Sequence, residues 1–220
     1  MKIGTPKLKN HVLAAFAFFG CTLLATPGVS ETAIVDGDTF DLNGVRIRLN
    51  GIDAPEYGQE CGSRDCGVEA LEALDKLIHS GPIECQSMGD DGYGRVIGKC
   101  SVAGQDIGAK LVSDGFAYAF VKYSADYIVE EESARSRGVG VWRGDYQRPW
   151  DFRAEKWASS EQTAPKGCPI KGNISENGQI YHAPWSPWYA KTRINEGKGE
   201  RWFCSEAEAV AAGWRAPRWR

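Results

Sequence analysis

The sequence lacks the excess of basic side chains that proteins gripping long nucleic acids usually carry. Its formal net charge is −3, and the imbalance is uneven along the chain. Residues 31–164 carry 14 basic and 24 acidic side chains, whereas residues 165–220 carry nine basic and five acidic ones. The net negative charge of residues 31–164 therefore argues against tight, sequence-independent binding of a polyanion by this part of the chain. Chemistry at a single phosphate stays open, because a bound cation and a few arginines can set the local field.

The sequence also lacks a hydrophobic run long enough to cross a membrane. Val12–Ala25 is uncharged, but it is shorter than the roughly 20 residues that a spanning helix needs. A basic segment precedes this run and small residues follow it, which is typical of a secretory signal. We therefore expect residues 1–30 to be a signal peptide and the mature protein to be periplasmic or secreted. A retained anchor is the alternative, and a lipid on Cys21 is disfavoured by the bulky Phe18-Phe19 before it.

No Cys-x-x-Cys pair is present, which argues against a metal site built from cysteines. Once the signal segment is removed, six cysteines remain, and an even number in an exported protein indicates disulfides. Cys85 and Cys100 are equidistant from a glycine-rich turn, so a hairpin folded there would bring their sulfur atoms together. Cys61 and Cys66 lie in one short loop, and Cys168 and Cys204 bracket the C-terminal segment. The expected disulfides are Cys61–Cys66, Cys85–Cys100 and Cys168–Cys204.

From residue 32 onward, short β-rich segments alternate with turn signals such as Asp-Gly-Asp and Asn43-Gly44. The expected strands are Thr32–Val35, Thr39–Leu42, Val45–Ile52 and the two halves of a hairpin over Ile83–Val102. The expected helices are Val68–His79, Ile107–Ser113 and Asp126–Arg137. Five short strands with helices inserted late indicate a mainly β, α+β domain built on a small OB-type barrel with about three helices.

Beyond this domain the composition turns to Ser, Gln, Thr, Ala and Pro, which is typical of a linker. We therefore expect the OB-type domain over residues 31–158, a linker over 159–167, and a small C-terminal module over 168–220. The module is rich in aromatic residues and contains a helix that begins after an N-cap at Ser205. It is short for a stable core, so a disulfide would stabilise it.

The C-terminal module leaves several functions open. Its aromatic side chains form either its own core or a surface on which bases or sugars stack, and the second reading is supported by its positive charge. A zinc site made by Cys168, His182 and Cys204 is a further alternative, although no fourth ligand is evident. The sequence assigns no activity to the module.

Carboxylates and arginines gather in three short segments of the OB-type domain. The first is the turn Asp36-Gly37-Asp38, and the third is the turn from Asp91 to Arg95. In the second, a strand carries Arg48 and is followed by Asp53 and Glu56, where a proline prevents the strand from continuing. Each segment alone is compatible with a solvated turn or an ordinary strand end. Together they supply oxygen ligands for a hard dication, a carboxylate base and arginines that stabilise charge, which are the parts that phosphodiester hydrolysis needs.

The same segments resemble the thermonuclease family, whose members carry the staphylococcal nuclease-like domain. The resemblance covers roughly residues 31–158 in the family's order. It is carried by Ile34–Glu56, Tyr93-Gly94-Arg95, Leu111–Ala117 and Gly140-Val141-Trp142. The resemblance implies an OB-type barrel and Ca²⁺-dependent cleavage of DNA and RNA without sequence preference.

By position in the family's motifs, Asp38 and Asp53 resemble the carboxylate ligands of one calcium ion. The carbonyl of Ala54 would be a further ligand, and Asp36 would lie just beyond the direct ligands. Glu56 resembles the general base that takes the proton of the attacking water.

Arg48 and Arg95 resemble the two arginines that bind the phosphate. Tyr93 and Tyr123 resemble the tyrosines that line the nucleotide pocket. The residue before Tyr93 is a glycine where a basic residue is common, and Val121 falls where a second aromatic sometimes lies. Both departures remove side chains that would be expected to contact the nucleotide.

The sequence thus predicts an exported, monomeric, calcium-dependent nuclease whose partner is nucleic acid. The alternative is a non-catalytic OB-type binding module that contacts proteins or polysaccharides, linked to surface polysaccharide biosynthesis. The carboxylates and arginines favour the enzyme, whereas the acidic charge and the thinned aromatic surface favour the binding module.

Overall fold

The computed structural model describes residues 31–218, and the expected signal peptide lies outside them. Its largest sheet is formed by the strands predicted in the first half of the chain. They are β1 (Thr32–Asp36), β2 (Thr39–Leu42), β3 (Val45–Leu49), β7 (Ile83–Asp90) and β8 (Val96–Val102), in the order β1-β2-β3-β8-β7, with β9 (Gln105–Asp106) paired to β8. β3 and β8 run parallel, and the other neighbours run antiparallel. The expected mainly β, α+β class is confirmed.

Two short strand pairs lie beside this sheet. The predicted strand Val45–Ile52 is divided, because its last residue belongs to β4 (Ile52–Asp53), which pairs with β10 (Tyr118–Ala119). β5 (Glu60–Cys61) pairs with β6 (Arg64–Asp65) in the loop that follows. The first pair therefore fixes the backbone at Asp53, and the second fixes the loop beyond Glu56.

The three predicted helices are present as α1 (Cys66–Ile78), α2 (Ile107–Ser113) and α3 (Ile128–Arg137). α1 and α2 begin after aspartates, Asp65 and Asp106, whose carboxylates each accept a backbone N–H of the first turn. A fourth helix, α4 (Pro149–Glu161), was not predicted and extends into the expected linker. Its proline stands in the first turn, where a missing N–H leaves no bond unmade. Short 3-10 turns occur at η1 (Gly140–Trp142), η2 (Pro165–Gly167) and η3 (Glu196–Lys198).

The main core lies between the large sheet and helices α1 and α2. Phe40 and Ile52 from the strands pack with Leu74 of α1 and with Ile107 and Leu111 of α2, and all five side chains are buried. Because this cluster fixes the ends of β2 and β4, it also fixes the loops that leave those strands.

The C-terminal module has a sheet and a core of its own. Its strands are β11 (Ile170–Ser175), β12 (Gly178–His182) and β13 (Arg201–Phe203), in the order β12-β11-β13, and they are followed by α5 (Glu206–Ala211). α5 begins after Ser205, whose hydroxyl accepts the Glu208 N–H as expected. The buried side chains of the module are Ile170, Tyr181, Phe203, Ala209 and Trp214.

All three expected disulfides are present: Cys61–Cys66, Cys85–Cys100 and Cys168–Cys204. Cys85 and Cys100 face each other directly in the β7–β8 ladder. The alternative zinc site is wrong, because Cys168 and Cys204 are bonded to each other. The ring nitrogens of His182 contact Ser186 and Asn173 instead of lying beside the two sulfur atoms.

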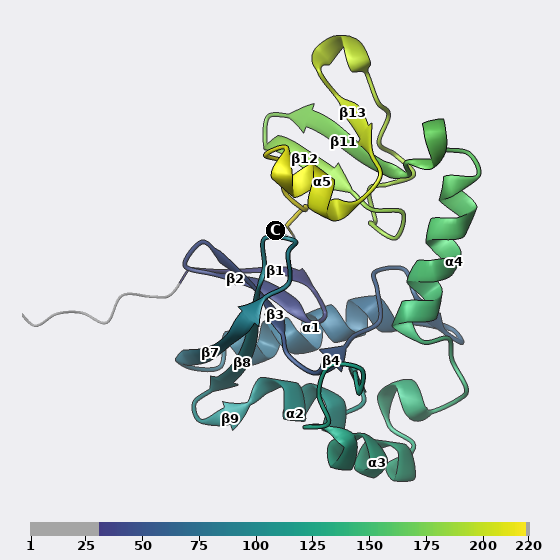
Figure 1. Ribbon diagram of the computed structural model, residues 1–220. Coiled ribbons are helices and arrows are strands. Elements are labelled where there is room, and N and C mark those ends of the chain that lie inside the picture. Colours follow the sequence, from purple (N-terminus) through teal and green to yellow (C-terminus); the bar gives the residue numbers. More distant parts are fainter. Residues whose placement is uncertain (1–30, 219–220) are drawn as a thin grey trace, which may run out of the picture.

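Figure 1 shows how the parts are arranged. The C-terminal sheet and α5 lie at one end of the molecule, α2 and α3 lie at the other, and the main sheet lies between them. α4 runs along one side, from the level of the main sheet to the C-terminal sheet. Within residues 31–218, no helix has both the length and the apolar composition of a membrane span.

Candidate active site

Four predicted site residues come together where β1, β3 and β4 end. Arg48 reaches from β3 between two carboxylates: its Nη1 lies 2.8 Å from Oδ2 of Asp38, and its Nη2 lies 3.0 Å from Oδ1 of Asp53. The side chain of Asp53 has no exposed area, and Asp38 is almost as buried. Glu56 lies three residues after Asp53 and belongs to the same cluster, because Arg153 pairs with both carboxylates.

Asp38 is held in place by the backbone around it. Its Oδ2 accepts the N–H of Ala54 at 3.0 Å, and its Oδ1 accepts the hydroxyl of Thr39 at 3.0 Å. The Asp38 N–H in turn donates to Oδ1 of Asp36 at 3.1 Å. A Cβ on the intervening Gly37 would lie 2.8 Å from the Cβ of Ala54, so the close approach of these two loops requires glycine there.

A second arginine completes the cluster, and the sequence did not predict it. Arg153 of α4 places Nη1 2.6 Å from Oε1 of Glu56 and Nη2 2.8 Å from Oδ2 of Asp53. Arg153 lies 100 residues from Asp53 along the chain. α4 was not predicted from the sequence, and no local pattern indicates a contact over such a separation.

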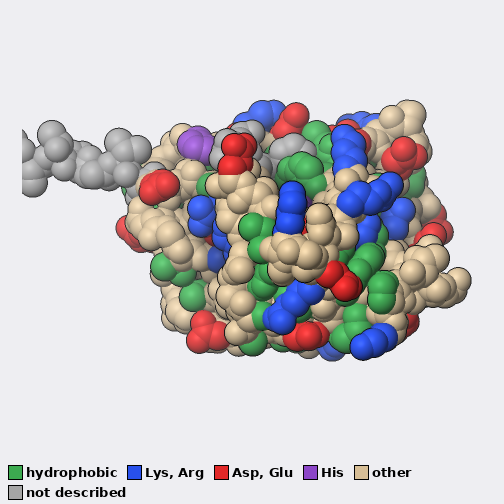
Figure 2. Space-filling view, turned by 90° about the horizontal axis from the view of Figure 1, so that it is seen from above, with side chains coloured by type: hydrophobic (Ala, Val, Ile, Leu, Met, Phe, Trp, Pro, Cys, Tyr) green, Lys and Arg blue, Asp and Glu red, His purple; other side chains and the backbone are tan. Residues whose placement is uncertain are grey.

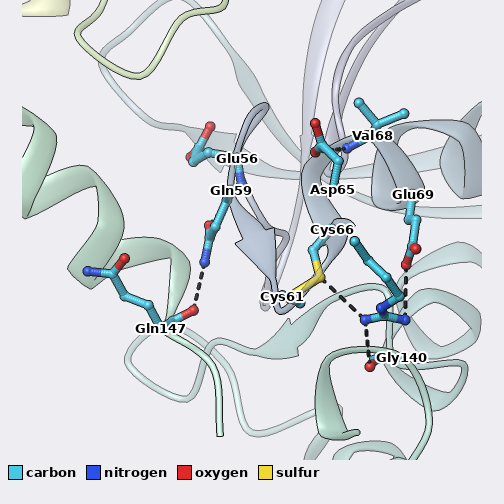
Figure 3. The surroundings of a disulfide bond; sticks show 10 residues. Glu56, Gln59, Cys61, Asp65, Cys66, Val68, Glu69, Gly140 and Gln147 are labelled. Atoms are coloured by element: carbon cyan, nitrogen blue, oxygen red, sulfur yellow. Dashed lines mark hydrogen bonds and ion pairs between the residues drawn. A yellow bond between two sulfur atoms is a disulfide. The ribbon is translucent and has the colours of Figure 1, made fainter. Parts of the chain in front are cut away.

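The segment that carries Glu56 is tied down on both sides. The N–H of Glu56 donates to Oε1 of Gln59, and Nε2 of the buried Gln59 donates to the carbonyl of Gln147 at 2.6 Å (Figure 3). A Cβ on Gly67 would lie 1.9 Å from the Glu56 carbonyl oxygen, so α1 can pass this close only with glycine at that position. The Cys61–Cys66 disulfide closes the same loop.

Arg64 joins this loop to the turn at η1. Its guanidinium donates to Sγ of Cys66 and to the carbonyl of Gly140 and pairs with Glu69 at 3.2 Å (Figure 3). The position of Glu56 is therefore set by hydrogen bonds, a disulfide and close packing rather than by a free loop.

Burial and mutual repulsion shift the pKa values of the four carboxylates in this cluster, against the opposing effect of its two arginines. Burial raises the pKa of Asp36 well above its ordinary value, and the neighbouring Asp38 and Glu56 raise it further. Burial also raises the pKa of Glu56, to about 7, against the opposing effect of Arg153. Burial raises the pKa of Asp38 too, but Arg48 and the Ala54 N–H outweigh it, so that pKa is lowered. Burial also raises the pKa of Asp53, against the opposing effects of Arg153 and Arg48. A further cation beside these carboxylates would stabilise their ionised forms.

The donor set fits a hard dication in its chemistry. Asp38 and Asp53 offer anionic oxygens, as Ca²⁺ prefers, and each already contacts the positive charge of Arg48. Within the described residues 31–218, no three His, Cys, Asp or Glu side chains gather in a metal-binding group. The predicted set requires only two side chains, because its remaining protein ligand is the Ala54 carbonyl.

Arg95 does not join the cluster. It pairs with Asp91 at 2.5 Å within the β7–β8 turn and lies over the ring of Tyr93. Nevertheless Arg95, Tyr93 and Tyr123 line the same pocket of about 630 Å³ as Asp38, Arg48, Glu56 and Arg153. Tyr93 and Tyr123 are largely exposed, so both rings are available to a ligand. The cluster and Arg95 thus face one space from different walls.

Two family models and several known proteins match this chain in sequence. The model of the family described as staphylococcal nuclease homologue matches residues 46–144, and a second model, described as ArfC, matches residues 152–216. The chain is 36% identical over 143 residues to a succinoglycan biosynthesis protein ExoI of Rhizobium meliloti, covering 60% of this chain and 73% of that protein. It is 33% identical to a micrococcal nuclease of Shigella flexneri, covering 54% of this chain and 76% of the relative. It is 30% identical to an uncharacterized endonuclease of Haemophilus influenzae, covering 50% and 62%.

The chain belongs to the staphylococcal nuclease homologue family, as the motifs indicated, and its main sheet and first helices form the OB-like domain of that family. At the level of the family, this supports a nuclease function. Arg153 lies outside the nuclease match and inside the second one. The candidate site therefore draws on both matched regions.

Proposed function

We propose that this protein is an exported nuclease that hydrolyses phosphodiester bonds of DNA, RNA or both, with Ca²⁺ as its cofactor. The observation that carries the proposal is the meeting of the buried Asp53 and of Glu56 with Arg48 and Arg153. Glu56 and both arginines line a pocket that Arg95 also lines. Buried carboxylates held by arginines are costly to assemble, and such arrangements gather at functional sites.

Calcium, if held by the carboxylates of Asp38 and Asp53 and the carbonyl of Ala54, would neutralise the phosphate and favour the ionisation of a bound water. The other roles belong to the side chains. Arg48 and Arg95 bind phosphate oxygens and stabilise the extra negative charge that develops as the water attacks phosphorus. Arg153 orients Glu56.

Glu56 acts as the general base. Its pKa of about 7 lies near the working pH expected for such a base, so the carboxylate is both available and basic enough. As the water oxygen bonds to phosphorus, its proton passes to Glu56. The bond between phosphorus and the leaving ester oxygen breaks, and that oxygen takes up a proton from solvent.

Export is supported by the three disulfides, because such bonds persist in oxidising compartments. We further propose that the protein acts as a monomer, that residues 1–30 are removed as a signal peptide, and that residues 31–158 and 168–220 act as two domains.

The test is degradation of DNA and RNA by the mature protein with Ca²⁺ and with a chelator. We expect cleavage with Ca²⁺ and its loss on chelation. Cleavage that persists with the chelator would show that the activity does not depend on Ca²⁺. A protein that cleaves neither polymer under either condition would instead be a binding module.

The non-catalytic alternative has two specific observations in its favour. A relative at 36% identity carries the name of a succinoglycan biosynthesis protein, and the acidic net charge of residues 31–164 weakens attraction to nucleic acids. On this reading the OB-like domain contacts proteins or polysaccharide. Binding of an acidic polysaccharide by a protein without nuclease activity would favour it.

A further inference from the structure

The candidate pocket has a second wall, which the C-terminal module supplies. Besides residues of the carboxylate cluster, the pocket is lined by Trp185, Pro187 and Trp188 of the segment that follows β12. Tyr93, Phe120 and Tyr123 of the OB-like domain line it as well. A volume of about 630 Å³ lies within the range of pockets that enclose small organic groups. Aromatic rings from two parts of the chain therefore border one space beside the arginines.

The module is fixed in this position by contacts on several sides. α4 carries Arg153 into the carboxylate cluster, and four residues later its Trp157 lies 6.4 Å from the ring of Trp185. On the opposite side of the module, Arg218 pairs with Asp41 of β2 at 2.5 Å. The wall is therefore held against the site by ion pairs and ring packing.

Trp185 and Trp188 are not among the buried side chains that form the core of the module, although the ring of Trp188 lies 6.2 Å from that of His182. That core is formed by Ile170, Tyr181, Phe203, Ala209 and Trp214, whereas Trp185 and Trp188 are only half-buried and face the pocket. Large aromatic side chains that remain partly in water lose part of the free energy that full burial would supply. Their position at a pocket that also contains arginines is typical of surfaces on which nucleobases stack.

Long-range electrostatic attraction contributes little to the binding of a polyanion at this surface. On the face seen in Figure 2, Lys and Arg side chains are interspersed with acidic and hydrophobic ones. A surface of mixed sign attracts a polyanion weakly, so selective affinity has to come from groups inside the pocket.

We propose that Trp185 and Trp188 form a base-binding wall, on which a nucleobase of a single-stranded substrate stacks while the adjacent phosphate lies at the arginines. This inference rests on the proposed function for the identity of the polymer. A single strand is required because a base in a duplex is paired and stacked on both sides and reaches such a wall only after it is flipped out. The module therefore makes unpaired regions the preferred substrate.

The test separates base stacking from charge by comparing two polyanions. Affinity is measured by fluorescence anisotropy for a labelled single-stranded oligothymidylate, and by competition for inorganic polyphosphate, which carries no bases. Both are measured with Glu56→Gln protein in Ca²⁺ and again in chelator, so that no substrate is consumed. We expect Trp188→Ala to weaken oligothymidylate binding about 5- to 100-fold and to leave polyphosphate binding unchanged.

Two variants control for structure. Trp188→Phe keeps an aromatic face and should retain most of the affinity. Trp202→Ala removes a half-buried tryptophan from β13 of the same module, outside the pocket lining, and should change neither affinity. Thermal unfolding of each variant identifies any that fail to fold, and Trp185→Ala then provides an independent test of the same wall.

The outcomes are distinct. Equal losses for both polyanions, or no loss in either tryptophan variant, would overturn the base-binding wall, even if wild-type protein cleaves nucleic acid. Base-dependent binding by a protein that cleaves nothing would leave the wall standing and overturn the proposed function. Equal affinity for a duplex of the same length would remove the preference for unpaired strands.

Discussion

Arg153 lies 2.6 Å from Glu56, although 97 residues separate them in the chain. The pair joins a helix near the C-terminal module to the carboxylate proposed as the general base. Because a guanidinium beside a carboxylate favours the ionised form, Arg153 opposes the effect of burial on the pKa of Glu56. The pKa of Glu56 is thus adjusted by a residue of α4, which lies outside the part of the chain matched by the nuclease family model.

Replacing Arg153 with Ala should move the acidic limb of the pH–activity profile to higher pH. Glu56 has a pKa of about 7 while Arg153 is present, and removing this cation raises the pKa further, so a higher pH is needed to keep the base ionised. The measurement is kcat/KM against pH at constant Ca²⁺. Arg153→Lys retains a positive charge and should shift the limb less. Identical profiles for Arg153→Ala and wild type would show that Arg153 does not act through Glu56.

Replacing Glu56 with Gln should lower turnover about 10²- to 10⁴-fold, because the amide cannot accept the proton of the attacking water. The N–H of Glu56 that bonds Gln59 is unchanged, so the loop should keep its fold. Steady-state kinetics and thermal unfolding measured together separate the two effects. Full activity in the variant would assign the base to another group.

Replacing Gly67 with Ala should damage both stability and activity. The new Cβ would lie 1.9 Å from the Glu56 carbonyl oxygen, a backbone atom that cannot move without moving Glu56. We expect a loss of about 1–3 kcal/mol in the free energy of unfolding, and a fall in turnover of about 10²-fold for a displacement near 1 Å. Gly197→Ala is the control, because its nearest contact, at 3.2 Å, is with a side-chain atom. Normal turnover in Gly67→Ala would show that the position of Glu56 is not critical.

Lowering the pH should destabilise the C-terminal module through protonation of His182. Burial, with a smaller contribution from Lys171, lowers the pKa of this imidazole to about 4, from about 6.5 in an unfolded chain. Folding favours the neutral form of His182. The contribution of this residue to the free energy of unfolding is therefore complete above pH 6.5 and is lost as the pH falls toward 4. The shift corresponds to at most about 3 kcal/mol. Chemical denaturation between pH 4 and 7, compared with His182→Gln, measures it, and equal pH dependence in both proteins would exclude His182 as the cause.

Breaking the Cys168–Cys204 disulfide by a double substitution with Ser should destabilise the module by about 2–4 kcal/mol. The bond closes a longer loop than Cys85–Cys100, with sequence separations of 36 and 15, so chain entropy predicts the larger loss at Cys168–Cys204. Denaturation curves of the two double variants make the comparison. A larger loss in the Cys85 and Cys100 variant would contradict the entropic account.

The parts of the fold that the sequence predicted are local ones. The β7–β8 hairpin followed from strand segments around one turn, and its symmetry about that turn placed Cys85 opposite Cys100. The meeting of Arg48 and Asp38 was expected only from the resemblance to the family. In the structure, antiparallel pairing sets Arg48 opposite Thr39, the neighbour of Asp38. Asp53 and Glu56 then follow within a few residues.

The parts that escaped prediction depend on distant contacts. The composition near residue 159 suggested a linker, yet α4 continues to Glu161, because its first half is held by ion pairs with Asp53 and Glu56. Nor did the sequence indicate that the C-terminal module would border the pocket. Such contacts are specified by the packing of whole elements, which no pattern within one segment reveals.

The path of α4 sets where a working fragment can end. A chain cut after residue 144, where the nuclease match stops, would keep every predicted ligand, base and phosphate-binding arginine. It would also leave the carboxylates of Asp53 and Glu56 without the guanidinium that now faces them both. A fragment that ends there lacks one residue of the candidate site, so any shortened version has to retain at least α4.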